Sequence, residues 1–131
     1  MRTRHDAGNE RGSAVVEFAL VLPLVLTVIL GIVEVGLAVR DRQLIEAAAR
    51  AGARAAAVQP DPAAVTSAAL AAAPGLDAAD VTVTVLRAGS RGDPVTVDVT
   101  YVHDVRVPLV GWLFSDGYTM ATSTTVRQEF T

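Results

Sequence analysis

An uncharged apolar run near the start of the chain decides what kind of protein this sequence can form. Residues 18–33 read FALVLPLVLTVILGIV without a charged side chain, and residues 35–39 extend the run past Glu34. A helix over residues 13–39 would be about 40 Å long at a rise of about 1.5 Å per residue, which is enough to cross a bilayer. The sequence therefore predicts a single N-terminal transmembrane helix.

A cleaved secretory signal peptide is the alternative interpretation of this run. The apolar region of a signal peptide is typically about 7–15 residues long and ends at a small-x-small site. Here the run is longer, a carboxylate stands near its start at Glu17, and helix-forming sequence continues through Leu44 and Ile45 to residue 58. These features favour an anchor that stays in the protein.

The part of the chain outside this run is small and chemically plain. It holds roughly 90 residues, which is too few for a large core and a deep catalytic cleft. The net charge of −3 argues against a nucleic-acid partner, and the absence of cysteine excludes disulfides and thiolate metal sites. Aromatic residues make up only 5% of the chain, so Ala and Val must supply most of the core.

The residues around Gly12 resemble a processing site. The string RGSAVVEFALVLPL places Gly12 directly before the apolar helix and Glu17 five residues after it, behind a short polar leader. This arrangement resembles the site of type IV pilin-like proteins, where a prepilin peptidase cuts after the Gly. The resemblance implies release of residues 1–12 as a leader peptide and Ser13 as the new N-terminus.

The longer pattern is similar to one family within that group. EVG near the end of the apolar run, the Arg/Ala helix AAARAGARAAAV and the tail ATSTTVRQEF resemble the TadE-like family, the minor pilins or pseudopilins of tight-adherence (Flp) pilus systems. The similarity is strong over residues 11–58 and weaker over residues 59–117. Major Flp pilins carry Tyr after the Glu, whereas this chain has Phe18, which favours a minor component.

Glu17 is the candidate assembly residue. An ionised carboxylate in hydrocarbon costs several kcal/mol, so a partner is expected to compensate it. The resemblance implies that this partner is the free amine on Ser13 of an adjacent subunit. The alternative is a solvated carboxylate in the headgroup region, because Glu17 lies only about 6 Å along the helix from Ser13. Glu34, near the far end of the run, is interpreted as interfacial, with no role beyond contact between subunits.

Beyond the membrane, residues 40–59 are expected to continue the helix as a stalk. Small residues recur at four-residue spacing on one face, where another backbone could approach closely; they are Ala48, Gly52 and Ala56. Arg50 and Arg54 lie near that face, and Glu46 stands four residues before Arg50, a favourable direction for an ion pair. The three small residues and the two arginines are candidates for packing between subunits. The alternative is a solvated Ala-rich helix that leans on its own ectodomain.

Residues 60–131 are expected to form a small α+β domain. Pro60 and Pro62 end the stalk, and Asp61 caps a second helix from Pro62 to about Ala73. The period then changes to two, which predicts a hairpin from residues 81–86 and 95–101, and a third strand within residues 118–130. The prediction is a pilin-like fold, in which a long helix and a short one pack on one face of an antiparallel sheet of about three strands.

The remaining sequence gives little sign of chemistry. His103 and Asp104 near Ser115 and Asp116 lack the spacing of a hydrolase triad, and His103 stands alone as a metal ligand. The apolar segment with Trp112 and Phe114 is either core filling or an exposed docking loop. The triplet at residues 91–93 spells an integrin-binding motif, and a hairpin tip produces such a triplet by chance. We therefore expect no catalytic, cofactor, metal or small-molecule site.

The functional prediction is a minor pilin that assists assembly of an adhesive Flp pilus. It would lie in the cytoplasmic membrane with its N-terminus inside and its C-terminal domain outside. Its partners would be the membrane, the prepilin peptidase, other pilus subunits and inner-membrane assembly proteins. The alternatives are an uncleaved membrane-anchored accessory protein of a secretion or envelope complex, and a membrane-tethered enzyme.

Overall fold

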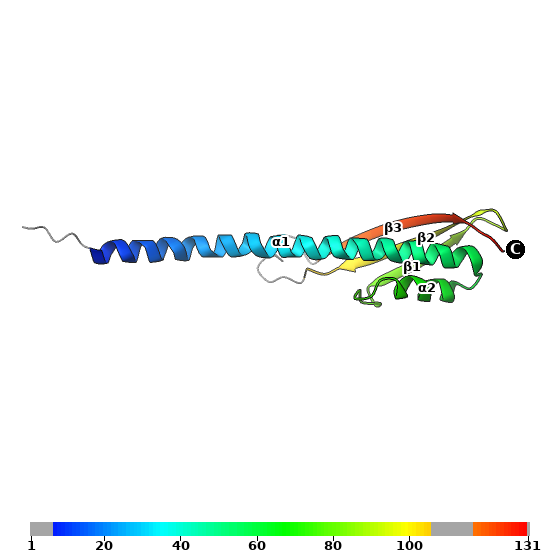
Figure 1. The fold of residues 1–131 in the computed structure, drawn as a ribbon, viewed down its shortest axis with the longest axis horizontal. Coiled ribbons are helices and arrows are strands. Elements are labelled where there is room, and N and C mark those ends of the chain that lie inside the picture. The colour runs from blue at the N-terminus through cyan, green and yellow to red at the C-terminus, as the bar shows by residue number, and fades with distance from the viewer. Residues whose placement is uncertain (1–6, 106–116, 131) are drawn as a thin grey trace, which may run out of the picture.

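The fold is a long helix that carries a small sheet on its second half. The computed structural model describes residues 7–105 and 117–130. Helix α1 runs without interruption over Ala7–Val58, through Pro23, and α2 follows over Pro62–Ala71. Three strands come next, β1 (Val81–Arg87), β2 (Pro94–His103) and β3 (Tyr118–Arg127). Figure 1 shows the N-terminal part of α1 projecting alone, while its C-terminal part lies beside the sheet.

The three strands form one antiparallel sheet in the order β1-β2-β3. In the β1–β2 hairpin, Val81 pairs with Tyr101 and Arg87 with Val95. Between β2 and β3 the register runs from Pro94 opposite Arg127 to His103 opposite Tyr118. The hairpin and the third strand predicted from the period of two are therefore confirmed, and the predicted α+β class is confirmed with them.

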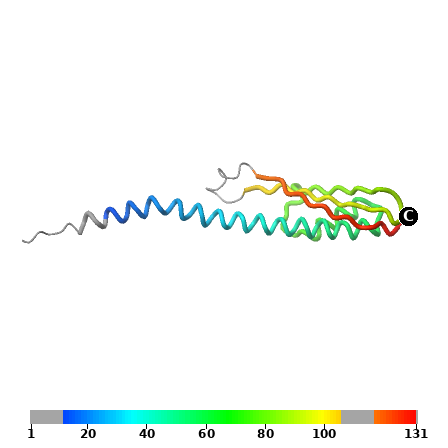
Figure 2. Tube along the Cα trace, turned by 90° about the horizontal axis from the view of Figure 1, so that it is seen from above, coloured from blue at the N-terminus to red at the C-terminus, as the bar shows by residue number. Residues whose placement is uncertain are grey.

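The hydrophobic core lies between the central strand and the second half of α1. Every second residue of β2 faces the helices with no exposed surface: Val95, Val97, Val99 and Tyr101. Each buried valine contributes about 1.5–3 kcal/mol relative to leaving it in water. The helices meet these side chains mostly with alanine, which keeps the layers close together. Figure 2 shows the same arrangement from above, with α1 and α2 on one side of the strands.

Gly52 marks the closest approach between α1 and the rest of the core. A Cβ atom built there would lie 3.1 Å from Val97 Cγ1 and 3.3 Å from Ala69 Cβ, so a side chain has almost no room. Ala48 and Ala56, one turn away on either side, are fully buried. The core thus crosses the expected boundary at residue 59, because the stalk supplies one of its two layers.

The ends of both helices are capped by recognisable contacts. Asp61 Oδ1 accepts a hydrogen bond from the Ala63 backbone N–H at 2.9 Å, as predicted from the sequence. The last turn of α1 has no basic residue of its own. Arg87 of β1 supplies the charge instead, since its guanidinium donates to the Ala56 carbonyl at 2.9 Å and to the Gln59 carbonyl at 2.7 Å. A cation at a helix C-terminus is favourable because it faces the negative end of the helix dipole.

Candidate functional site

The first half of α1 is apolar and makes no packing contact with the sheet. The side chains of residues 12–26 are all exposed, and Phe18, Leu20 and Ile32 expose 64%, 75% and 68% of their surface. Among the described residues, α1 is the one helix long and apolar enough to cross a membrane. An exposed apolar surface of this length needs a lipid or protein partner, because water solvates it poorly.

The residues of the expected processing site lie on this exposed half. Gly12 and Ser13 are exposed and stand inside α1, so a protease would have to unwind the first turns of the helix to reach the bond between them. Glu17 and Phe18 are also exposed. Within residues 7–105 and 117–130, the structure brings no other segment to these four residues, so their roles stay predictions.

The expected packing residues of the stalk fall into two groups. Ala48, Gly52 and Ala56 are buried in the protein's own core, beneath α2 and β2, so a second subunit could reach them only by displacing those elements. Arg50 and Arg54 are exposed on the outer face. The predicted ion pair between Glu46 and Arg50 is present at 3.9 Å, and Arg42 contacts the same carboxylate at 2.9 Å.

A buried polar cluster lies where the exposed half of α1 meets the end of the sheet. The His103 ring is fully buried, Nε2 lies 2.9 Å from Glu34 Oε1, and Nδ1 lies 2.9 Å from Asp41 Oδ2. The two carboxylates are 3% and 1% exposed. The interpretation of Glu34 as an interfacial residue without an internal role is therefore wrong, because its carboxylate binds His103 inside the protein.

The geometry of the cluster requires one more proton than a neutral imidazole carries. A neutral imidazole carries one N–H, whereas both ring nitrogens here face carboxylate oxygens. Either the histidine is an imidazolium between two carboxylates, or it is neutral and one carboxyl is protonated. Arg40 lies 3.2 Å from the other oxygen of Asp41, so an imidazolium would give a cluster of two positive and two negative charges. Such balance is what makes buried charges tolerable.

Tyr118 of β3 packs against this cluster from the sheet edge. Its ring centroid lies 5.1 Å from that of His103, with the planes tilted by 45°. Partial burial raises the pKa of the Tyr118 phenol, and the nearby carboxylates of Glu34 and Asp41 raise it further. The phenol is therefore held in its neutral form, which suits a group placed beside negative charge.

Two features of the sequence point to this cluster when they are taken together. Glu34 and Asp41 are seven residues apart, which places them on one face of a helix two turns from each other. His103 continues the alternation of Val95 to Tyr101 and so belongs on the inner face of β2. Among the described residues, no group of three or more His, Cys, Asp or Glu side chains could hold a metal ion. In this cluster the two carboxylates bind opposite sides of the imidazole ring.

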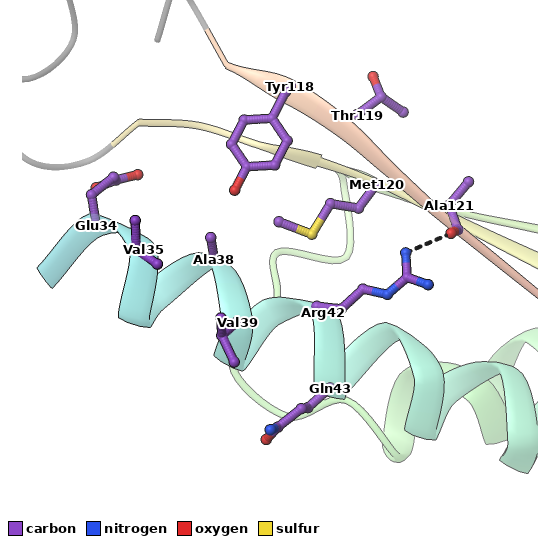
Figure 3. A pocket seen from close by; sticks show the side chains of 10 residues that line it. All are labelled: Glu34, Val35, Ala38, Val39, Arg42, Gln43, Tyr118, Thr119, Met120 and Ala121. Atoms are coloured by element: carbon purple, nitrogen blue, oxygen red, sulfur yellow. Dashed lines mark hydrogen bonds between the residues drawn. The ribbon is translucent and has the colours of Figure 1, made fainter. Parts of the chain in front are cut away.

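An apolar groove of about 710 Å³ opens beside the cluster, between α1 and the edge strand β3. Its helix side is formed by Val35, Ala38 and Val39, with Arg42 at one end. In Figure 3, Tyr118 and Met120 point from β3 toward the helix, and Arg42 reaches back to the Ala121 carbonyl. That hydrogen bond is 2.9 Å long and turns the guanidinium toward the strand. The apolar segment with Trp112 and Phe114 lies outside the described residues.

Comparison with known proteins supports the resemblance found in the sequence. Residues 12–54 match the model of the family described as TadE-like protein. No curated protein and no solved structure matches the chain. The matched segment contains the exposed half of α1, both carboxylates of the buried cluster and the helix side of the groove. The match therefore includes most of the helix that, among the described residues, is long and apolar enough to cross a membrane.

Proposed function

We propose that this chain is a minor pilin or pseudopilin that assists the assembly of a tight-adherence (Flp) pilus from the cytoplasmic membrane. The observation that carries the proposal is the division of α1. Its first half is an exposed apolar rod, its second half is the core layer of a compact ectodomain, and the TadE-like match spans both. A protein of this shape can be held in a membrane and can later leave the membrane and join a filament as one unit.

The contacts of the sheet suggest a shorter spanning segment than residues 13–39. His103 binds Glu34, so the ectodomain already contacts α1 six residues before the expected boundary at Arg40. Strand ends and a charged cluster do not belong in hydrocarbon. A span over residues 13–33 is about 31 Å long, which equals the thickness of the hydrocarbon core.

The orientation follows from the proposed processing. A prepilin peptidase acts at the cytoplasmic face, so residues 1–12 would lie inside and the sheet outside. Arginine stands on both sides of the span, at residues 2, 4 and 11 and at residues 40, 42, 50 and 54, and the positive-inside rule gives no opposing argument. Other pilus subunits and inner-membrane assembly proteins would be the partners of the ectodomain and of α1.

Sequencing the N-terminus of the protein purified from its native membrane tests the processing step. We expect mature chains that begin at Ser13, and a Gly12→Leu variant that keeps its leader. The matched control is Gly36→Leu, because Gly36 also lies exposed on α1 with open space around it. Mature chains that begin at Met1 would favour the uncleaved accessory protein instead.

Glu17 is proposed to act in assembly and not in insertion. Glu17→Ala removes a carboxylate that is expensive in hydrocarbon, so the amount of protein in the membrane should stay level or rise. If Glu17 pairs with the Ser13 amine of a neighbour, the same change leaves that amine uncompensated, at a penalty of about 3–5 kcal/mol. Co-purification with other pilus subunits should then fall by orders of magnitude. Normal co-purification of the variant would show that Glu17 is merely an interfacial carboxylate.

A further inference from the structure

The exposed face of α1 carries a row of β-branched side chains at heptad spacing. Six consecutive positions at alternating steps of four and three residues are valine or isoleucine: Val21, Val25, Val28, Ile32, Val35 and Val39. Between 44% and 68% of each of these residues is exposed. A 3.5-residue repeat keeps one seam of a helix facing a partner helix, and β-branched residues pack well as knobs into its holes. We call these six residues the seam.

The seam runs directly into the groove between α1 and β3. Its last two members, Val35 and Val39, line the groove, and the next position of the repeat, Arg42, ends it. Arg42 donates to Glu46 and to the Ala121 carbonyl, both at 2.9 Å, so its charge is drawn away from the seam. Ala38 lies beside the seam and is small enough to let another backbone approach. The groove is thus the outer end of a continuous helix-binding face.

We propose that a second copy of this chain occupies this face, with the two α1 helices parallel and each helix lying in the groove of the other. A heptad seam requires a partner that carries a matching seam, and the chain itself supplies one. Copies that enter the membrane by one route share one orientation, so their seams meet in register. The contact is then symmetric, since the same patch serves on both copies.

The groove also supplies a driving force that the membrane part of the seam lacks. Within lipid, apolar side chains gain little from leaving a solvent as apolar as themselves, and helices associate through packing alone. Val35 and Val39 lie beyond the proposed span, where water surrounds the groove. Their burial by a second helix is therefore favoured by the hydrophobic effect. The inference rests on the membrane placement given under the proposed function.

The chain contains no cysteine, so single cysteines report the contact directly. Val28→Cys lies in the seam, and Leu26→Cys is the matched control, because Leu26 is 41% exposed at nearly the same depth on another face of α1. After oxidation of membranes that contain the full-length protein, we expect disulfide-linked dimer from Val28→Cys at a yield about tenfold above that of Leu26→Cys. Equal yields, or no dimer from Val28→Cys, would overturn the proposal.

A second substitution separates the groove from the membrane seam. Adding Val39→Arg to Val28→Cys should lower the dimer yield about tenfold, because it places charge in the groove beside Arg42. Val58→Arg is the control, since Val58 is exposed to a similar extent at the far end of α1. A yield that Val39→Arg leaves unchanged would contradict docking in the groove, and a cross-link to a protein of another mass would contradict the second copy. A chain missing from the membrane fraction would instead contradict the proposed function.

Discussion

Replacing His103 tests whether the buried cluster holds the sheet onto α1. In His103→Leu, Glu34 and Asp41 each lose a 2.9 Å hydrogen bond and the positive charge that an imidazolium would provide, while both carboxylates stay buried. Removing one partner of a buried charge network costs about 3–5 kcal/mol, which is a large share of the roughly 5–15 kcal/mol that stabilises a domain. We expect the ectodomain to be severely destabilised.

Urea unfolding of the full-length protein in mild detergent, followed by the circular dichroism of the sheet, measures this effect. The midpoint should fall by more than about 1 M urea at a typical slope for a small domain. Val102→Leu is the matched control, because Val102 precedes His103 on the outer face of β2 and is 43% exposed. It should change the midpoint little.

A triple variant distinguishes lost hydrogen bonds from lost volume. When Glu34, Asp41 and His103 are all replaced by leucine, no charge remains to be buried, and such replacements of ionic networks are often neutral or stabilising. We expect the triple variant to recover most of the stability lost in His103→Leu. A His103→Leu variant within about 0.5 kcal/mol of the parent protein would refute the reasoning.

Three further predictions concern the close packing, the helix cap and the tyrosine. Gly52→Leu should destabilise the ectodomain by about 1–3 kcal/mol in the same urea assay, because its side chain would collide with Val97. Arg87→Met should cost about 1.5–3 kcal/mol through loss of the bonds to the end of α1, whereas Arg91→Met, at the exposed hairpin tip, should change little. Absorbance titration should show that the Tyr118 phenol ionises above its ordinary pKa of 10.0, and Tyr118→Phe should remove that phase. Because the folded pKa of Tyr118 is raised, its contribution to stability is complete below pH 10.0 and is lost as the pH rises through the folded value.

The elements of the fold could be predicted because each has a local signal. Asp61 followed by Pro62 marks the start of α2, and the alternation from Val95 to Tyr101 marks the inner face of β2. The predicted second helix extended to about Ala73, whereas the observed helix ends at Ala71 with Ala72 as its C-cap. Such ends depend on one or two hydrogen bonds and are less well determined by sequence than the element itself.

The site was harder to predict because its contacts join distant segments. Glu34 stands in an apolar run, so its local sequence indicates a position at the membrane. Nothing near it in the sequence indicates contact with a histidine 69 positions further along. The spacing of Ala48, Gly52 and Ala56 indicates close approach by another element, but it does not say whether that element belongs to the same chain. In the structure the protein's own α2 and β2 make that approach, and the seam on the exposed face remains for another helix.

The position of β2 between the other strands has a consequence for the order in which the protein can fold during its synthesis. The inner residues of β2 complete the core, and its last residue binds helix positions made 62 and 69 residues earlier. Until that strand is made, α2 alone covers part of the alanine face of α1, and both buried carboxylates lack their histidine. Contacts of such long range form late and together. A chain interrupted before β2 would therefore expose the apolar side of α1 and α2 that faces the sheet, and such incomplete intermediates are prone to aggregation.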